Sequence, residues 1–296
     1  MRFEIVHSTK YVYAQPVLFD LHWLRVQPRS GGDQRLEEFS LEVHPTPAGI
    51  TNCLDADGNA AAICYVRERH DRLEFTSRSV VTTLRENPFD YQLDPRATSL
   101  PLAYNEAEAA VLAPARARAL AEGSPGDAVA EFAKEIATRA GGRAVEFLTR
   151  LNDEIHARCR IVRREQGPPL TPEATLSGRE GACRDLAVLF IDAARAQGMA
   201  ARFVSGYFDG DDEHDRDLHA WAEVYVPGGG WRGYDPTTAL AAADQHVAIA
   251  SAIAPAGAAP ITGIYYGPAV DANMHADVSI RRLPDTSASQ QQHQHQ

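Results

Sequence analysis

Three residues in the second half of the chain have side chains that could together perform acyl transfer. Cys183 stands in the segment REGACRDLA (179–187), His219 in LHAWAEVYV (218–226), and Asp235 in GWRGYDPT (230–237). A cysteine thiolate attacks carbonyl carbons, an imidazole carries the proton, and a carboxylate orients the imidazole. Their order and spacing therefore indicate a cysteine nucleophile with a base and an orienting acid.

The segment around Cys183 predicts that the thiol lies at the start of a helix. A glycine-containing turn runs directly into an apolar helical pattern, which ends at Gln197 and Gly198. Apolar residues occupy most faces of this helix, so we expect it to be buried. Free amides at a helix start, together with the helix dipole, favour the thiolate and supply a donor for an oxyanion.

Two predicted strands carry the other two residues. Residues 201–208 and 218–226 alternate like strands joined by an acidic turn, and a third strand, 231–234, follows a glycine-rich turn. His219 lies early in the second strand and Asp235 ends the third, within reach of the imidazole. Trp221 and Tyr234 neighbour them and could line an acyl pocket or simply be buried strand aromatics.

Each of these residues has an ordinary structural alternative. A cysteine at a helix start is usually a small buried hydrophobe, and aspartate before Pro-Thr is a common turn residue. Arg184 could bind a substrate carboxylate or be solvated. Cys183, His219 and Asp235 could also be zinc ligands, although their spread over a helix and strands suits a triad better than a preformed metal cage.

The remaining sequence predicts a two-domain α+β protein. Residues 1–90 have the closely spaced alternating patterns of an antiparallel β-sandwich, residues 91–123 are predicted to be a linker, residues 124–285 the catalytic domain, and residues 286–296 a disordered tail. The turn at Asp57-Gly58 predicts a hairpin between Cys53 and Cys64. We expect two reduced thiols there, although a disulfide is the alternative.

The composition and net charge of the chain limit the classes of partner that it is expected to bind. The net charge is −11 and the pI is near 5.5, which argues against nucleic-acid or anionic-membrane partners. The chain has neither a signal-peptide pattern nor an apolar run long enough to span a bilayer, so we expect a cytoplasmic protein. The acidic segment 209–217 lacks the glycine and terminal glutamate of a calcium-binding loop and is predicted to be solvated.

The three motifs resemble those of the transglutaminase-like superfamily. GACRDLA (181–187) with GMAARFVSGY (198–207) is similar to its cysteine motif, and the segments around His219 and Asp235 are similar to its histidine and aspartate motifs. The resemblance implies a papain-like α+β core in which Cys183 is the nucleophile, His219 the general base and acid, and Asp235 the orienting carboxylate. The commoner bacterial pattern has glutamine where this chain has Arg184.

The resemblance also implies a β-rich domain before the core, as in bacterial members often described as candidate cysteine proteases. The expected reaction forms an acyl-enzyme on a peptide or protein substrate, with neither a metal nor another cofactor. Water as the acceptor makes a protease or amidase, and an amine makes a transglutaminase; the triad is the same for both. The family descriptions favour hydrolysis. A non-catalytic peptide-binding module is the remaining alternative, and the sequence makes no prediction of oligomeric state.

Overall fold

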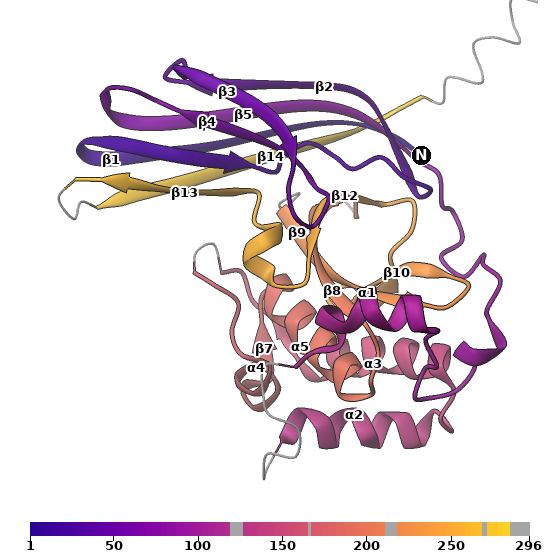
Figure 1. The fold of residues 1–296 in the computed structure, drawn as a ribbon. Helices are drawn as coiled ribbons and strands as arrows, with labels where there is room; N and C mark the ends of the chain where they lie inside the picture. Colours follow the sequence, from indigo (N-terminus) through magenta and orange to yellow (C-terminus); the bar gives the residue numbers. More distant parts are fainter. Residues whose placement is uncertain (119–126, 165–166, 211–217, 268–270, 285–296) are drawn as a thin grey trace, which may run out of the picture.

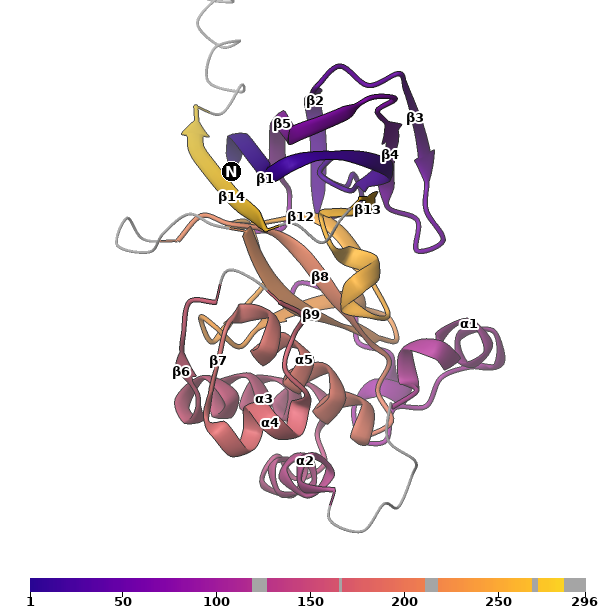
Figure 2. The same cartoon turned by 90° about the vertical axis from the view of Figure 1, so that its left-hand side faces the viewer.

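The chain folds into three layers in the computed structural model, which describes residues 1–118, 127–164, 167–210, 218–267 and 271–284 (Figure 1). A curled antiparallel sheet forms the first layer, a second antiparallel sheet lies beneath it, and helices cover the far side of that second sheet (Figure 2). The predicted α+β fold class, with antiparallel β structure before a helical core, is confirmed.

The first third of the chain forms one continuous sheet in the order β2-β5-β1-β4-β3. Its strands are β1 (Arg2–Leu24), β2 (Gln34–His44), β3 (Gly49–Leu54), β4 (Ala60–Tyr65) and β5 (Arg69–Thr83). Alternate residues of β1 such as Phe3 and Ile5 are buried, as the period-two pattern predicts. The long strand β1 changes partner along its length: residues 2–12 and 17–18 pair with β5, whereas residues 22–24 pair with β4.

The hairpin predicted around Asp57-Gly58 is the β3–β4 pair. Cys53 lies opposite Ala61 and Cys64 opposite Ile50, so the two cysteines are not cross-strand partners. Both are free thiols, and Cys64 is buried, which raises its pKa to about 11.

The end of the chain returns to the N-terminal sheet. Strands β13 (Ile261–Tyr266) and β14 (Ala272–Leu283) pair antiparallel with β1, so the first and last strands lie side by side (Figure 1). The predicted catalytic domain runs to residue 285, whereas in the structure residues 261–283 belong to this sheet. The difference arises because a strand pattern does not specify which strand will be its neighbour.

The second sheet has five strands in the order β11-β10-β9-β8-β12. They are β8 (Ala201–Phe208), β9 (Leu218–Val226), β10 (Gly230–Asp235), β11 (Leu240–Ala241) and β12 (His246–Ala252). The ranges predicted for the first two of these strands are confirmed. Both ends of β8 and β9 coincide with the ends of the alternating patterns.

Helices pack against one face of this sheet: α2 (Ala128–Arg139), α3 (Ala144–Arg158), α4 (Pro172–Gly178) and α5 (Cys183–Ala196). Helix α5 contacts both α2 and β9 and has nine buried residues, as its all-round apolar pattern predicts. Its Leu186, Leu189 and Phe190 join Phe147 and Leu151 of α3 in the main hydrophobic core. Two short parallel strands, β6 (Arg160–Ile161) and β7 (Glu180–Gly181), precede α5.

The predicted irregular linker contains a helix. After a 3-10 turn, η1 (Pro95–Ala97), α1 spans Glu106–Arg116. Asn105 accepts from the Glu108 amide and the Glu108 carboxylate accepts from the Asn105 amide, both at 2.8 Å. This reciprocal cap stabilises the start of α1, which continues through Pro114 to its last residues. Residues 119–126 and the predicted disordered tail lie outside the described residues.

Two buried side-chain amides attach the N-terminal sheet to the edge of the second sheet. Gln34 donates to the Ala248 carbonyl at 2.9 Å and accepts from the Ala248 amide at 2.7 Å. Asn59 does the same with Ser251, at 2.9 and 2.8 Å. Each amide therefore supplies the hydrogen bonds that a neighbouring strand would otherwise give to the edge strand β12.

A buried ion-pair network reinforces this junction. Glu223 of β9 accepts from Arg202 of β8 at 2.7 Å and from Arg29, which precedes β2, at 3.4 Å. Burial alone would raise the pKa of Glu223, but the two guanidinium groups outweigh it and hold that pKa below its usual value. The junction between the two sheets also includes a hydrogen bond between the His7 ring of β1 and the Tyr207 hydroxyl of β8, 3.0 Å apart.

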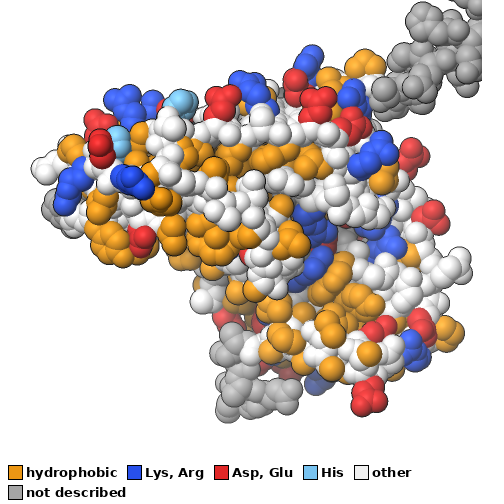
Figure 3. Space-filling model, turned by 45° about the horizontal axis from the view of Figure 1, so that its top comes forward, with side chains coloured by type: hydrophobic (Ala, Val, Ile, Leu, Met, Phe, Trp, Pro, Cys, Tyr) orange, Lys and Arg blue, Asp and Glu red, His pale blue; other side chains and the backbone are white. Residues whose placement is uncertain are grey.

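The outer face of the N-terminal sheet carries side chains of mixed character. Charged groups of both signs are interspersed with hydrophobic ones over this face (Figure 3). The exposed hydrophobic residues of β1 and β3 include Leu21, Ile50 and Leu54. Within the described ranges, no helix is long and apolar enough to cross a membrane.

The contacts of Gln34 predict how much stability the fold loses when this side-chain amide is removed. Gln34→Leu keeps the side-chain volume but leaves the buried Ala248 amide without its acceptor, so we expect the free energy of unfolding to fall by about 1–3 kcal/mol. Urea unfolding at neutral pH measures it. Gln15→Leu, at an exposed position of β1, is the matched control and should change stability by less than about 0.5 kcal/mol. Equal stability of the two variants would contradict the role of the Gln34 amide in joining the two sheets.

Candidate active site

Cys183 is the first residue of α5, as the sequence predicts, and its neighbours fix the start of that helix. The fully buried carboxylate of Asp185 accepts from the Ala182 amide at 2.8 Å, the Leu170 amide at 2.8 Å and Arg164 at 2.5 Å. These contacts hold the first turn in place. Cys183 itself is half-buried, and its amide, like others in a first turn, has no intrahelical acceptor.

His219 lies near the start of β9 and contacts both of its predicted partners. Its Nε2 is 2.7 Å from Asp235 Oδ2, and the ring also hydrogen-bonds the Cys183 side chain. With Nε2 directed at Asp235, Nδ1 is the nitrogen left for the thiol. Burial alone would lower the pKa of His219, but the charge of Asp235 and the hydrogen bonds with Asp235 and Cys183 raise it to about 10.

Asp235 ends β10 with its carboxylate completely buried. Oδ1 accepts from the Thr237 amide at 2.9 Å, and Oδ2 accepts from the Thr238 hydroxyl at 2.9 Å as well as from His219. Burial alone would raise the pKa of Asp235, but the charge of His219 and the histidine hydrogen bonds hold it well below its usual range. The carboxylate is therefore ionised and pinned by the turn that follows it.

A second histidine, which the sequence analysis missed, also contacts Asp235. His246 begins β12, and its Nε2 lies 3.2 Å from Asp235 Oδ2. The segment HVAIASA (246–252) has the apolar character of a buried strand, which could have drawn attention to a histidine at its start. Its approach to Asp235, however, depends on β12 pairing with β8, which no local pattern reveals.

Trp221 and Tyr234 lie on opposite sides of the sheet. Trp221, on the same side of β9 as His219, packs over Gly206 of β8 and Gly233 of β10; a Cβ at Gly206 would lie 2.5 Å from the indole. Tyr234 stacks on Phe190 of α5, with the ring centroids 5.5 Å apart. Both aromatic side chains are only 2% exposed, and their role in an acyl pocket stays a prediction.

Arg184 follows Cys183 in the first turn of α5 and is half-buried. Burial and the neighbouring charge of Arg164 lower its pKa, whereas Asp185 and Cys183 act in the opposite direction. The guanidinium group is thus near the nucleophile. A role in binding substrate stays a prediction.

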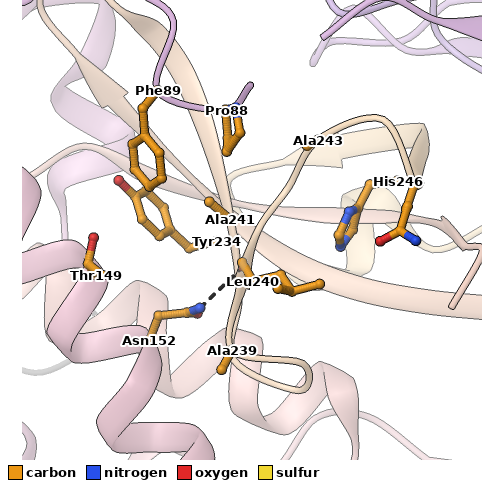
Figure 4. A pocket seen from close by; sticks show the side chains of 11 residues that line it. Pro88, Phe89, Thr149, Asn152, Tyr234, Ala239, Leu240, Ala241, Ala243 and His246 are labelled. Atoms are coloured by element: carbon orange, nitrogen blue, oxygen red, sulfur yellow. Dashed lines mark hydrogen bonds between the residues drawn. The ribbon is translucent and has the colours of Figure 1, made fainter. Parts of the chain in front are cut away.

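A cavity of about 390 Å³ adjoins the site on the His246 side. It is lined by Tyr234, Leu240 and His246 together with residues of α3 and of the segment after β5, and Asn152 of α3 donates to the Leu240 carbonyl at its rim (Figure 4). Cys183 and His219 are not among the lining residues. The cavity therefore reaches the rear of the Asp235 network rather than the nucleophile.

The sequence raised two possible cation sites: the predicted triad and the acidic segment 209–217. In the described part of the chain, no three His, Cys, Asp or Glu side chains are arranged to hold a metal ion; His219 lies between Cys183 and Asp235, so the three do not converge on one point. In the acidic segment, Asp209 is buried and pairs with Arg282 of β14. Residues 211–217 of that segment lie outside the described residues.

The chain matches two family models. Residues 130–236 match the transglutaminase-like superfamily, and residues 3–82 match the bacterial transglutaminase-like N-terminal region. Together the matches cover more than half of the chain and include Cys183, His219 and Asp235. The chain belongs to the transglutaminase-like superfamily, with the N-terminal region found in its bacterial members.

Similar proteins span nearly the whole chain. An uncharacterised protein of Mycobacterium tuberculosis is 28% identical, with 96% of this chain and 93% of the relative aligned. One of Mycobacterium leprae is 26% identical, with 90% and 94% aligned. A crystal structure of a candidate cysteine protease from Cytophaga hutchinsonii superposes with a TM-score of 0.70 at 20% identity, covering 97% of this chain and 92% of that one. That likeness shows a shared fold.

His219 makes the stability of the fold depend on pH. Its pKa rises from 6.5 to about 10 on folding, so the folded state binds the additional proton between these values. The stabilisation is fully present below about pH 6.5 and is lost as the pH rises toward 10. We expect the difference in unfolding free energy between wild type and His219→Gln to shrink across this window in urea titrations. His44→Gln, at an exposed position, should follow wild type; a pH-independent difference would contradict the assignment.

Proposed function

We propose that the chain is a cysteine-nucleophile acyl-transfer enzyme that acts on peptide or carboxamide bonds through Cys183, His219 and Asp235. The observation that supports this most strongly is the position of His219, whose Nε2 lies 2.7 Å from Asp235 Oδ2 while the nearby Cys183 side chain contributes to raising its pKa. A histidine that served only packing would not need an ionised, fully buried carboxylate on one side and a half-buried thiol on the other.

In the first half of the proposed reaction, the Cys183 thiolate attacks the substrate carbonyl carbon. The carbonyl π electrons move to oxygen, and the resulting oxyanion accepts a hydrogen bond from the first-turn amide of α5. The C–N bond then breaks while the His219 imidazolium gives its proton to the departing amine. The products of this half-reaction are the free amine, a neutral imidazole and a thioester on Cys183.

In the second half, His219 takes a proton from the nucleophile that attacks the thioester. Attack by water releases a carboxylic acid and regenerates the thiolate–imidazolium pair, which makes the enzyme a protease or amidase. We propose hydrolysis, in keeping with the description of the Cytophaga hutchinsonii protein as a candidate cysteine protease. Attack by a primary amine would instead make a transglutaminase. No cofactor enters either route.

The proposal extends to substrate contacts and location. Arg184 is adjacent to the nucleophile and could bind a carboxylate of a peptide or protein substrate. We propose that Trp221, on the same side of the sheet as His219, lines the acyl pocket, whereas Tyr234, on the other side, supports it by stacking on Phe190 of α5. We propose a cytoplasmic location, where the four free cysteines would stay reduced.

Selective alkylation tests whether Cys183 is activated. With iodoacetamide at about pH 5.5, we expect Cys183 to react on the order of a hundredfold faster than Cys53, because only a thiolate is nucleophilic at that pH. Cys53 is the matched internal control, since both thiols are half-buried. Mass spectrometry of tryptic peptides gives the two rates.

Variants identify the source of the activation. His219→Ala should reduce the rate at Cys183 to that at Cys53, and His275→Ala, at an exposed position of β14, should leave it unchanged. Equal labelling of Cys183 and Cys53 in the wild type would exclude the proposed nucleophile.

The acyl acceptor is tested separately with a glutamine-containing peptide. We expect release of ammonia or peptide cleavage without added amine, because water completes the proposed cycle. Addition of a primary amine such as methylamine should leave most product hydrolysed. Predominant formation of the amine adduct, detected by mass spectrometry, would establish transamidation instead. Cys183→Ser should abolish both products.

A further inference from the structure

Asp235 Oδ2 is shared by three donors: His219 at 2.7 Å, the Thr238 hydroxyl at 2.9 Å and His246 at 3.2 Å. We propose that His246 is a positioning residue that moderates the hold of Asp235 on the His219 proton. The inference rests on the proposed function, because it concerns the same acyl-transfer site. It adds a fourth member to the Cys183–His219–Asp235 arrangement.

The protonation state of His246 follows from its surroundings. An ionised carboxylate only accepts hydrogen bonds, so His246 Nε2 must carry a proton and donate it. The other nitrogen, Nδ1, is buried and has no hydrogen-bond partner among the described residues. Burial also lowers the pKa of His246 despite the nearby Asp235. His246 is therefore a neutral imidazole with Nε2–H toward Asp235 and an unprotonated Nδ1.

Packing holds the His246 ring in this orientation. The ring centroid is 4.7 Å from that of Phe208 and 5.2 Å from that of Trp221, which itself packs over two glycines. His246 is only 6% exposed. The ring is confined on the β8 and β9 sides, so its N–H stays directed at the carboxylate.

The charged groups that face His246 come from each neighbouring element. Asp235 of β10 and Asp244 of the preceding turn favour its protonation, and the His219 imidazolium of β9 opposes it. Glu223, Arg85 and Asp33 line a small hollow beside the ring, and Glu223 is already paired with Arg29 and Arg202. The hydrogen bond to Asp235 is thus the contact through which His246 can act on the triad.

A neutral donor on Oδ2 has a defined effect on His219. It stabilises the carboxylate charge without adding a net positive charge, so Asp235 attracts the imidazolium proton less strongly than it otherwise would. The proposed acylation step requires that same proton to move to the leaving amine. Because the pKa of His219 is about 10, a stronger carboxylate would make the imidazolium a poorer general acid.

The cavity beside His246 permits an independent test by chemical rescue. About 390 Å³ of space adjoins the ring, and His246→Ala would enlarge it. Added imidazole could therefore enter and place an N–H against Asp235.

The first experiment compares His246→Phe, which has no donor, with His246→Gln, which retains an N–H. With a substrate that the wild type turns over, we expect His246→Phe to lower kcat about tenfold with little change in KM, by analogy with the loss of other residues that orient a catalytic group. His246→Gln should retain most of kcat. Imidazole should restore part of the activity of His246→Ala but should not affect His246→Phe, in which the phenyl ring occupies the place next to Asp235 that imidazole would need.

The second readout is the NMR titration of His219 through its Cε1–H signal, which does not require turnover. The pKa of His219 should rise in His246→Phe by roughly half to one pH unit and stay near the wild-type value in His246→Gln. His7→Phe is the matched control, a buried histidine of β1 that contacts Tyr207 of β8 and makes no contact with Asp235; it should lower stability without changing either kcat or the His219 titration.

The outcomes separate the two proposals. An active wild type, with kcat and the His219 pKa unchanged in His246→Phe, would overturn the role of His246. Equal losses in His246→Phe and His246→Gln without imidazole rescue would do the same, because they would show a requirement for packing alone. A wild type with neither turnover nor selective Cys183 alkylation would refute the proposed function, while the His219 titration would still show whether His246 acts on Asp235.

Discussion

The buried carboxylate of Asp235 is the constraint on which the rest of the site depends. It is completely inaccessible to solvent yet ionised, and a buried charge without partners would cost several kcal/mol. Its partners come from separate elements: His219 from β9, two threonines from the turn after β10, and His246 from β12. The strand order of the second sheet is therefore a condition for keeping this charge in the fold, and the charge in turn keeps His219 protonated.

The same strand, β12, joins the site to the N-terminal sheet. His246 is its first residue, and the Gln34 and Asn59 amides bind its backbone two and five residues further on, at Ala248 and Ser251. Without the N-terminal sheet, β12 would be a bare edge with unpaired donors and acceptors. The N-terminal region is thus part of the structure that holds the Asp235 partners in register. This gives it a physical role although it carries none of the three predicted catalytic side chains.

The sequence patterns predicted those features of the fold that depend on residues close together in the chain. The start of α5 at Cys183, the ranges of β8 and β9, and the β3–β4 hairpin follow from capping, alternation and turn residues close together in the chain. The contacts among Cys183, His219 and Asp235 could be anticipated because adjacent strands and their helix are consecutive in sequence. His246 could not, since its position depends on β12 crossing to the outer edge beside β8. The pairing of β13 and β14 with β1, more than 230 residues apart at Leu24 and Ile261, is likewise invisible to any local pattern.

This long-range pairing also bears on how the site is assembled. The residues of the site, 183–246, lie in sequence between two segments that pair with each other, β1 at one end and β13 and β14 at the other. Contacts between such distant segments are costly to form in entropy and are expected to form late in folding. The sheet that clamps β12 is therefore complete only when both ends of the chain are in place. The position of the buried Asp235 carboxylate therefore depends on a sheet that is built from both the first and the last strands of the chain.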